Sequence, residues 1–313
     1  MAENKAPEIN EITGELLKLV SDWDGKYKGA YNIRVDGTCA GRQSSDNIAI
    51  LSKEDKPGLD IRIRPGTKGE SVSIPACVTY GGVDDLVYND FYVGENADVT
   101  IVAGCGVHTT TGEPARHNGI HRFFLAPGSR VKYIEKHVGT GKGIGLRTID
   151  PVTEAFLEEG ATLEMDTSQI GGVDRTVRDT KCNLGKDARL VIRERLLTEK
   201  QQTAKTNFTV TMLGDGSAAD VVSRSVARDE SRQEYVSVVI GEAACTGHTE
   251  CDAIISGKAQ VDASPRLFAR NEDAALIHEA AIGKIAGEQI LKLRTLGLTE
   301  QEAEEKIIEG FLS

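Results

Sequence analysis

Cys251 and its neighbours are the part of the sequence best suited to binding a metal. The stretch GHTECDAIISG, residues 247–257, places this cysteine between Glu250 and Asp252, just before a small apolar run that predicts a β-strand. A thiolate is a soft ligand that suits iron. The acidic neighbours suit an exposed strand better than a protein core. From these residues alone three roles stay open: a core thiol, half of a disulfide, or a metal ligand.

A His–Glu pair, His278 and Glu279, follows in the stretch LIHEAAIGKIAG. We expect it at the junction between the last strand and the first C-terminal helix. On a continuing strand the two side chains would point to opposite faces, whereas at a chain bend or across a subunit interface both could contact one ligand. Taken alone, an exposed pair of this kind is typical of an ordinary polar surface.

Histidines also gather in the middle of the chain. Four of the six lie within residues 108–137, and Cys105-x2-His108 and His117-x3-His121 have spacings like those of metal ligands. On a strand, His117 and His121 would share a face. Because this is not a zinc-finger spacing, a metal site is the minor interpretation, and a structural or tunnel-lining role is favoured.

The composition disfavours several classes of protein. A net charge of −11 argues against binding to duplex nucleic acid or to an anionic membrane surface. No run of about 20 apolar residues could span a membrane. The first residues carry acids where a signal peptide needs a basic and then an apolar segment, so we expect a cytoplasmic protein. In that reducing compartment the six cysteines are expected as thiols or metal ligands before disulfides.

Motifs for nucleotide binding and hydrolysis are missing from the sequence. In GTGKGIG, residues 139–145, Gly143 follows Lys142 where a P-loop needs Ser or Thr, so we expect this chain to bind no nucleotide. No Gly-x-Ser-x-Gly elbow occurs. A carbohydrate-active β-helix enzyme would need clustered acids, and the one tempting group is expected in a loop: Asp84, Asp85 and Asp90.

A helix and a long β region must position these residues. Residues 8–23 carry apolar side chains at helical spacing, namely Ile9, Ile12, Leu16, Leu19, Val20 and Trp23. From about 30 to 280 the pattern changes to β-branched runs that alternate with polar residues. A weak repeat runs through this region, with turn residues 32, 32, 27 and 29 positions apart: Asn96, Gly128, Gly160, Asp187 and Gly216. Repeats of this length with strand patterns favour a β-helix over the alternative, a β-sandwich with hairpins.

Two helices are expected at the C-terminal end. The first covers Lys284–Leu296 and ends at Gly297, a good capping residue. The second covers residues 299–312, with Thr299 and Glu302 forming a capping box. Such a pair could cap the open end of a β-helix or present an apolar face to another protein.

The C-terminal motifs resemble a known family. TECDAIISG followed by IHEAAIGKIAGEQILKLRTLGLTEQEAEEKIIEGF looks like the C-terminal signature of the SufB/SufD family of iron–sulfur cluster assembly proteins. The likeness is specific over residues 245–313 and looser over 90–245, where HRFFLAPGSRVKYIEKH is similar to a family stretch. The chain is shorter than a typical SufB and looks like the compact SufB-like subunit of minimal systems, which pairs with itself.

This resemblance implies a fold, a function and partners. The fold would be a right-handed parallel β-helix core over 31–280, between an N-terminal helical segment, 1–30, and C-terminal helices, 281–313, that dock on an ATPase. The chain would be a scaffold and not an enzyme. It would work with a SufC-type ABC ATPase, form a homodimer or pair with a SufB/SufD-like partner, and pass clusters to recipient apo-proteins. A SufD-like structural subunit that holds no cluster is the alternative, and the presence of Cys251 argues against it.

The resemblance also implies site residues. Cys251, His278 and Glu279 match the family residues at the dimer interface and would hold a transient iron–sulfur cluster there. Larger SufB proteins carry a second functional cysteine that receives sulfur, for which Cys182 and Cys105 are the candidates here. The family's Gln-x-Trp tunnel pair is replaced by Glu135 and His137, so the candidate sulfur path comprises Glu135, His137 and Cys182.

Overall fold

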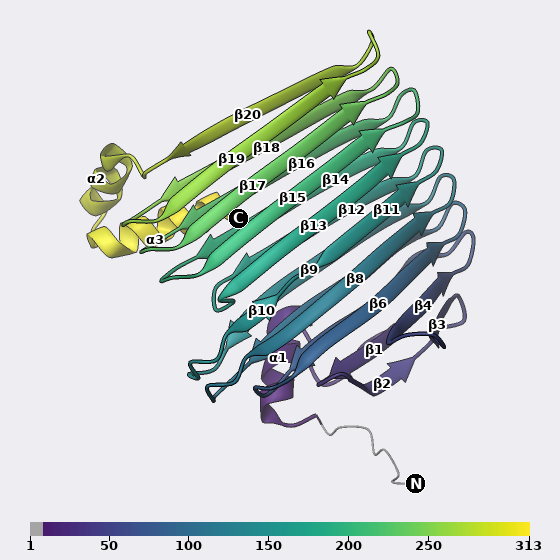
Figure 1. Cartoon of the computed structure of the whole chain (residues 1–313), viewed down its shortest axis with the longest axis horizontal. Coiled ribbons are helices and arrows are strands. Elements are labelled where there is room, and N and C mark those ends of the chain that lie inside the picture. Colours follow the sequence, from purple (N-terminus) through teal and green to yellow (C-terminus); the bar gives the residue numbers. More distant parts are fainter. Residues whose placement is uncertain (1–8) are drawn as a thin grey trace.

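A computed structural model describes residues 9–313 as two facing ten-stranded sheets with helices at both chain ends (Figure 1). The first sheet has the order β2 (Thr38–Gln43), β1 (Ala30–Val35), β5 (Lys68–Val78), β7 (Asp98–His108), β9 (Arg130–Thr140), β12 (Thr162–Ile170), β14 (Arg189–Thr198), β16 (Ala218–Ala227), β18 (Thr246–Ile255) and β20 (Ala275–Gly283). The second sheet has the order β19 (Gln260–Ala269), β17 (Arg232–Gly241), β15 (Thr203–Met212), β13 (Arg175–Leu184), β10 (Arg147–Ile149), β8 (Ala115–Leu125), β6 (Asp84–Val93), β4 (Gly58–Ile63) and β3 (Ile48–Ser52), and β11 (Val152–Leu157) also pairs between β13 and β8. The helices are α1 (Glu11–Ser21), α2 (Gly287–Thr295) and α3 (Glu300–Phe311).

The chain winds as a parallel β-helix from β4 onward. Apart from β10 and β11, which both lie in the second sheet, strands that follow one another in sequence go to opposite sheets. Each strand pairs in parallel with the strand one turn later, as β14 does with β16 over ten residues. The described antiparallel pairs are β1 with β2 and β3 with β4, both at the N-terminal end. The predicted β-helix, with a helix before it and two after it, is confirmed, and the β-sandwich alternative is wrong.

Stacked turns at one corner explain the repeat in the sequence. Each turn residue donates its backbone N–H to a carbonyl of the next turn, for example Gly128 to Glu159 and Gly160 to Lys186, both at 2.9 Å. The five predicted turn residues all have positive φ angles: Asn96, Gly128, Gly160, Asp187 and Gly216. Gly, Asn and Asp tolerate this left-handed backbone better than other residues do.

The glycines of the 139–145 stretch allow neighbouring turns to approach closely. A Cβ atom on Gly143 would lie 2.4 Å from the carbonyl oxygen of Thr111, and one on Gly145 would lie 1.9 Å from that of Glu113. Backbone contacts this short exclude any side chain. Packing between turns therefore accounts for these glycines.

Helix α1 covers the outer face of the first sheet near its N-terminal end. Val20 packs onto Gly104, where a Cβ atom would lie 2.2 Å from the Val20 carbonyl oxygen. The helix is shorter than the predicted 8–23, and residue 8 lies outside the described residues. Its buried stripe is also shifted, because Leu17 is buried whereas Leu19 is 49% exposed.

The C-terminal end of the β-helix is open. β19 and β20 are the last strands of their sheets, and no described element lies beyond their free edges (Figure 1). Leu267 pairs with buried Val239 and Ile282 with buried Ala253, so both face the interior, yet they are 38% and 42% exposed. A β-helix interior left uncovered in this way exposes apolar surface that a second chain could cover.

Helix α2 lies beside the strand ends (Figure 1), and the chain end after α3 reaches the outer face of the first sheet, where Ser313 lines a pocket with Asp220 and His248. Neither helix lies across the open end (Figure 1). The interpretation that they cap the β-helix is therefore wrong. The predicted capping box of α3 is confirmed, because Thr299 and Glu302 exchange side-chain and backbone hydrogen bonds. Helix α2 buries none of its residues. Among the described helices, none is long and apolar enough to cross a membrane.

Candidate functional site

Cys251 and His278 meet on the inner face of the first sheet, on its last two strands. The Sγ of Cys251 on β18 lies 3.7 Å from the Nε2 of His278 on β20. The other ring nitrogen of His278, Nδ1, lies 2.6 Å from the Thr249 hydroxyl, which fixes the orientation of the ring. Cys251 is only 5% exposed. The strand is therefore not exposed on its inner face, contrary to the expectation from the acidic neighbours.

Strand alternation explains how a buried thiol can have two acidic neighbours. Glu250 and Asp252 point to the outer face of the sheet while Cys251 points inward. Burial raises the pKa of Cys251 to about 11, and the charges of Asp252 and Glu250 act in the same direction. Burial lowers the pKa of His278. Near neutral pH the pair is therefore a protonated thiol beside a neutral imidazole, and a metal has to displace the thiol proton.

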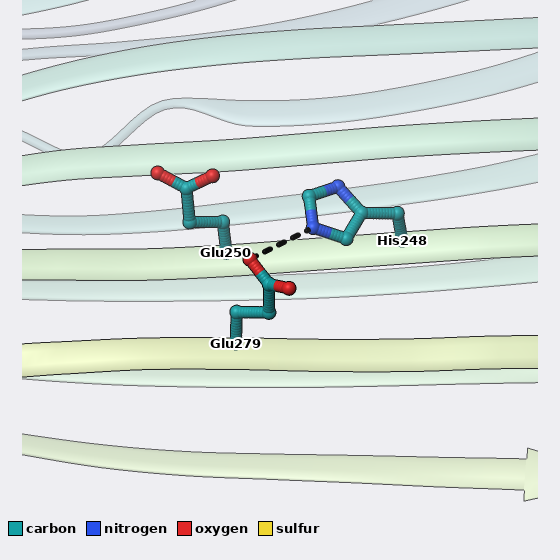
Figure 2. A group of neighbouring side chains, drawn as sticks. All are labelled: His248, Glu250 and Glu279. Atoms are coloured by element: carbon teal, nitrogen blue, oxygen red, sulfur yellow. Dashed lines mark ion pairs between the residues drawn. The ribbon is translucent and has the colours of Figure 1, made fainter.

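Glu279 points away from this pair. Of the two arrangements left open by the sequence, a chain bend at 278–279 is absent, because β20 continues to Gly283 and places His278 and Glu279 on opposite faces. On the outer face Glu279 joins two residues of β18, His248 and Glu250, and one ligand atom from each lies within 4.8 Å of the others (Figure 2). Within one chain, Cys251 and His278 come together and Glu279 does not join them.

His117 and His121 share the inner face of β8, as their spacing predicts. The Nδ1 of His117 lies 3.0 Å from an oxygen of Asp85, and the Nδ1 of His121 lies 2.8 Å from the hydroxyl of Tyr133. Burial lowers the pKa of His121 to about 4, so its ring is neutral at pH 7. Burial opposes ionisation of Asp85, but hydrogen bonds from His117 and Arg34 hold its pKa below the usual range.

Cys105 and His108 do not complete a metal site with these histidines. His108 lies apart, with its Nδ1 2.8 Å from the hydroxyl of Thr140. In the described part of the chain, the four residues Cys105, His108, His117 and His121 bring no three ligand atoms within 4.8 Å of one another. The acids of β6 do not converge either, because Asp85 points inward and Asp90 pairs with Arg122 at 2.6 Å.

Comparison with known proteins identifies the family of the chain. A family model described as the SufBD core domain of the SUF system for FeS cluster assembly matches residues 89–311. The chain belongs to the SufBD family of iron–sulfur cluster assembly proteins. The predicted resemblance is therefore confirmed.

Several archaeal SufBD-family proteins are similar over most of the chain. An iron–sulfur cluster assembly SufBD family protein of Methanothermobacter thermautotrophicus is 30% identical over 266 residues, which are 82% of this chain and 62% of that protein. One from Archaeoglobus fulgidus is 28% identical over 274 residues, 87% of this chain and 72% of the relative. One from Pyrococcus horikoshii is 28% identical over 283 residues, 84% of each chain. The chain thus spans less than two thirds of the length of the first of these relatives.

A column of polar side chains runs through the interior of this SufBD-family chain. At its centre Arg178 contacts Glu135 at 2.6 Å and Glu194 at 3.4 Å, and Glu135 also lies 3.4 Å from His137. We call the set the interior polar column: His121, Tyr133, Glu135, His137, Arg178, Glu194 and Ser223. Burial opposes ionisation of Glu135, but the charge of Arg178 holds its pKa well below the usual range. The column is therefore charged although it is buried.

The interior polar column connects the two cysteine regions. Near its N-terminal end a cavity of about 270 Å³ is lined by Cys105, His117 and His121, together with Arg34 and Cys39. At the other end Ser223 donates to Glu194 at 2.6 Å, and Ser223 is the strand partner of Cys251. Cys182 packs in the same apolar core as Cys251, but it neither lines this cavity nor belongs to the interior polar column, and burial raises its pKa to about 12.

Sequence reasoning missed several of these residues. Arg178, Glu194 and His248 belong to no motif that we recognised. Arg178 and Glu194 do carry a signal, because each charged residue occupies an inward position of an alternating strand, where apolar residues are expected. Thirty residues lie between His248 and Glu279 in the sequence. The two side chains meet because one turn of the β-helix places β20 beside β18.

Proposed function

We propose that the chain is a scaffold subunit on which a nascent iron–sulfur cluster is held at Cys251 and His278. The observation that carries this proposal is the 3.7 Å contact between a thiol and a neutral imidazole next to the open end. Permanent clusters in ferredoxins are held by four cysteine thiolates. One thiolate and one imidazole from each chain would hold a cluster less tightly, which suits a scaffold that has to release its product to recipient apo-proteins.

The cluster site would be shared between two chains. β20 is the edge strand of the first sheet and carries His278, so a second copy or a SufB/SufD-like partner that paired with this edge would bring its own ligands close. The exposed interior at Leu267 and Ile282 supports such an interface. We place the dimer in the cytoplasm, where thiol ligands stay reduced.

The C-terminal helices would bind a SufC-type ABC ATPase. Leu291 and Leu296 are exposed on and just after α2, whereas the residues predicted to form the docking face are half-buried: Ile290, Leu293, Ile307 and Phe311. The docking face would therefore include Leu291 and Leu296. Because the chain itself has no P-loop, ATP hydrolysis would belong to the separate subunit.

Sulfur would travel along the interior polar column. Cys105 borders the cavity at one end, and Ser223 lies beside Cys251 at the other. This arrangement favours Cys105 over Cys182 as the residue that receives sulfur. Glu135 and His137, which the resemblance matches to the family's tunnel pair, would then line the path and hold or pass protons.

Anaerobic reconstitution with ferrous iron and sulfide tests the scaffold role against the SufD-like alternative. The full chain should develop the visible absorption of an iron–sulfur cluster and keep bound iron and sulfide through gel filtration. A chain that stays colourless, while still binding the ATPase subunit, would be a structural subunit without a cluster.

A further inference from the structure

The outer face of the first sheet carries a second group of ligand atoms, on the opposite side of β18 and β20 from Cys251. His248 and Glu250 point outward from β18, and Glu279 points outward from β20 as the direct strand partner of Glu250. Figure 2 shows the Glu279 carboxylate next to the imidazole of His248. The Nε2 of His248 lies 3.9 Å from an oxygen of Glu279, which is too far for a hydrogen bond.

Asp220 orients the imidazole for metal binding. The Nδ1 of His248 lies 2.8 Å from a carboxylate oxygen of Asp220, on the neighbouring strand β16. The carboxylate of Asp220 also forms an ion pair with Arg193. It therefore accepts the Nδ1 proton and leaves the Nε2 lone pair facing Glu279. Metal-binding histidines donate their second ring N–H to a carboxylate, a backbone carbonyl or water in nearly all sites.

Negative charge is crowded around this point. Glu250 and Glu279 are direct strand partners on this face, and Asp252 points outward two positions further along β18. The positive charge of Arg193 is already paired with Asp220. The positive charge of Arg224 partly offsets the repulsion at Glu250, but no ion pair joins these two side chains among the described residues. A divalent cation between the carboxylates would relieve the repulsion.

We propose that His248, Glu250 and Glu279 bind one divalent transition-metal ion through an imidazole nitrogen and carboxylate oxygens. This donor set suits Fe²⁺, Mn²⁺, Co²⁺ or Zn²⁺ better than Mg²⁺, because it includes a nitrogen ligand. If the chain is a cluster scaffold, as proposed above, the ion is ferrous iron held directly behind the inner pair. That last step rests on the proposed function, whereas the site itself does not.

Cobalt(II) is the probe that tests this site. The full-length Cys251→Ser variant, titrated with Co²⁺ by calorimetry, should bind one ion without the intense thiolate-to-cobalt absorption. In that background His248→Gln and Glu279→Gln should each weaken binding at least about tenfold, and Asp220→Asn, which removes the orienting carboxylate, about 10-fold to 100-fold. Glu164→Gln removes an exposed carboxylate from the outer face of the same sheet and should leave the affinity unchanged.

Two results would overturn the proposal. One is a Cys251→Ser chain that binds no Co²⁺, and the other is unchanged affinity in both His248→Gln and Glu279→Gln. Circular dichroism of each variant verifies that it is folded. Because every titration lacks the Cys251 thiol, its outcome is independent of whether Cys251 holds a cluster.

Discussion

The Sγ of Cys251 and the Nε2 of His278 lie 3.7 Å apart on the last two strands of the first sheet. Both side chains face the β-helix interior, yet the strand that carries His278 has a free edge. This position combines a buried thiol with access for a second chain. The protonation of Cys251 and the pairing of two chains can therefore be tested separately.

Metal binding at the inner pair should strengthen as the pH rises. The pKa of Cys251 is raised to about 11, so below that pH each bound ion has to displace one thiol proton. The apparent affinity for Co²⁺, followed by thiolate-to-cobalt absorption, should increase by as much as about tenfold per pH unit between pH 6.5 and 8.5. His278→Ala should weaken binding but keep this slope. An affinity that is independent of pH would mean that the thiol proton is not displaced.

Pairing through the open end should depend on Ile282. Placing a charge there with Ile282→Lys should convert dimers to monomers in light scattering, because a lysine cannot be buried unpaired in an apolar interface. The matched control is Leu51→Lys, which changes an exposed apolar residue on β3 at the opposite end of the β-helix. If Ile282→Lys stays dimeric, or wild type is monomeric at micromolar concentration, the chains do not associate through this end.

The sequence allows more of the fold to be predicted than of the candidate site. The stacked turns repeat in the sequence because each needs a residue that tolerates positive φ, as Asn96 and Asp187 do. The inward face of Cys251 follows from strand alternation, because Glu250 and Asp252 on either side of it share the opposite face. The grouping of Glu279 with His248 depends on the pairing of β18 with β20, a long-range contact with no local signal.

Arg178 should be a large contributor to stability. Arg178→Met would leave Glu135 and Glu194 buried without their cationic partner, which costs about 3–5 kcal/mol in comparable buried pairs. Urea denaturation should show this loss. Arg195→Met, which breaks a partly exposed pair with Asp166, should cost less than about 1 kcal/mol. Similar losses in both variants would contradict a large contribution of the buried Arg178 pairs to stability.

ATPase binding should depend on the exposed apolar residues of the C-terminal helical pair. The double change Leu291→Asp and Leu296→Asp should abolish pull-down of the SufC-type subunit without lowering the melting temperature, because neither side chain is buried. Ile144→Asp changes an exposed apolar residue far along the chain and serves as the control. Retained binding by the double variant would place the ATPase on another surface.

The central claim is that Cys251 is a cluster ligand and not merely a core thiol. The most direct test measures bound iron, bound sulfide and melting temperature together on reconstituted Cys251→Ser, with Cys182→Ser as a matched buried cysteine in the same core. We expect Cys251→Ser to lose most of its iron and sulfide, and Cys182→Ser to keep both. Burying a serine hydroxyl without a partner costs on the order of 1–3 kcal/mol, so both variants can melt lower. Full iron loading in Cys251→Ser, with only a lower melting temperature, would contradict the account.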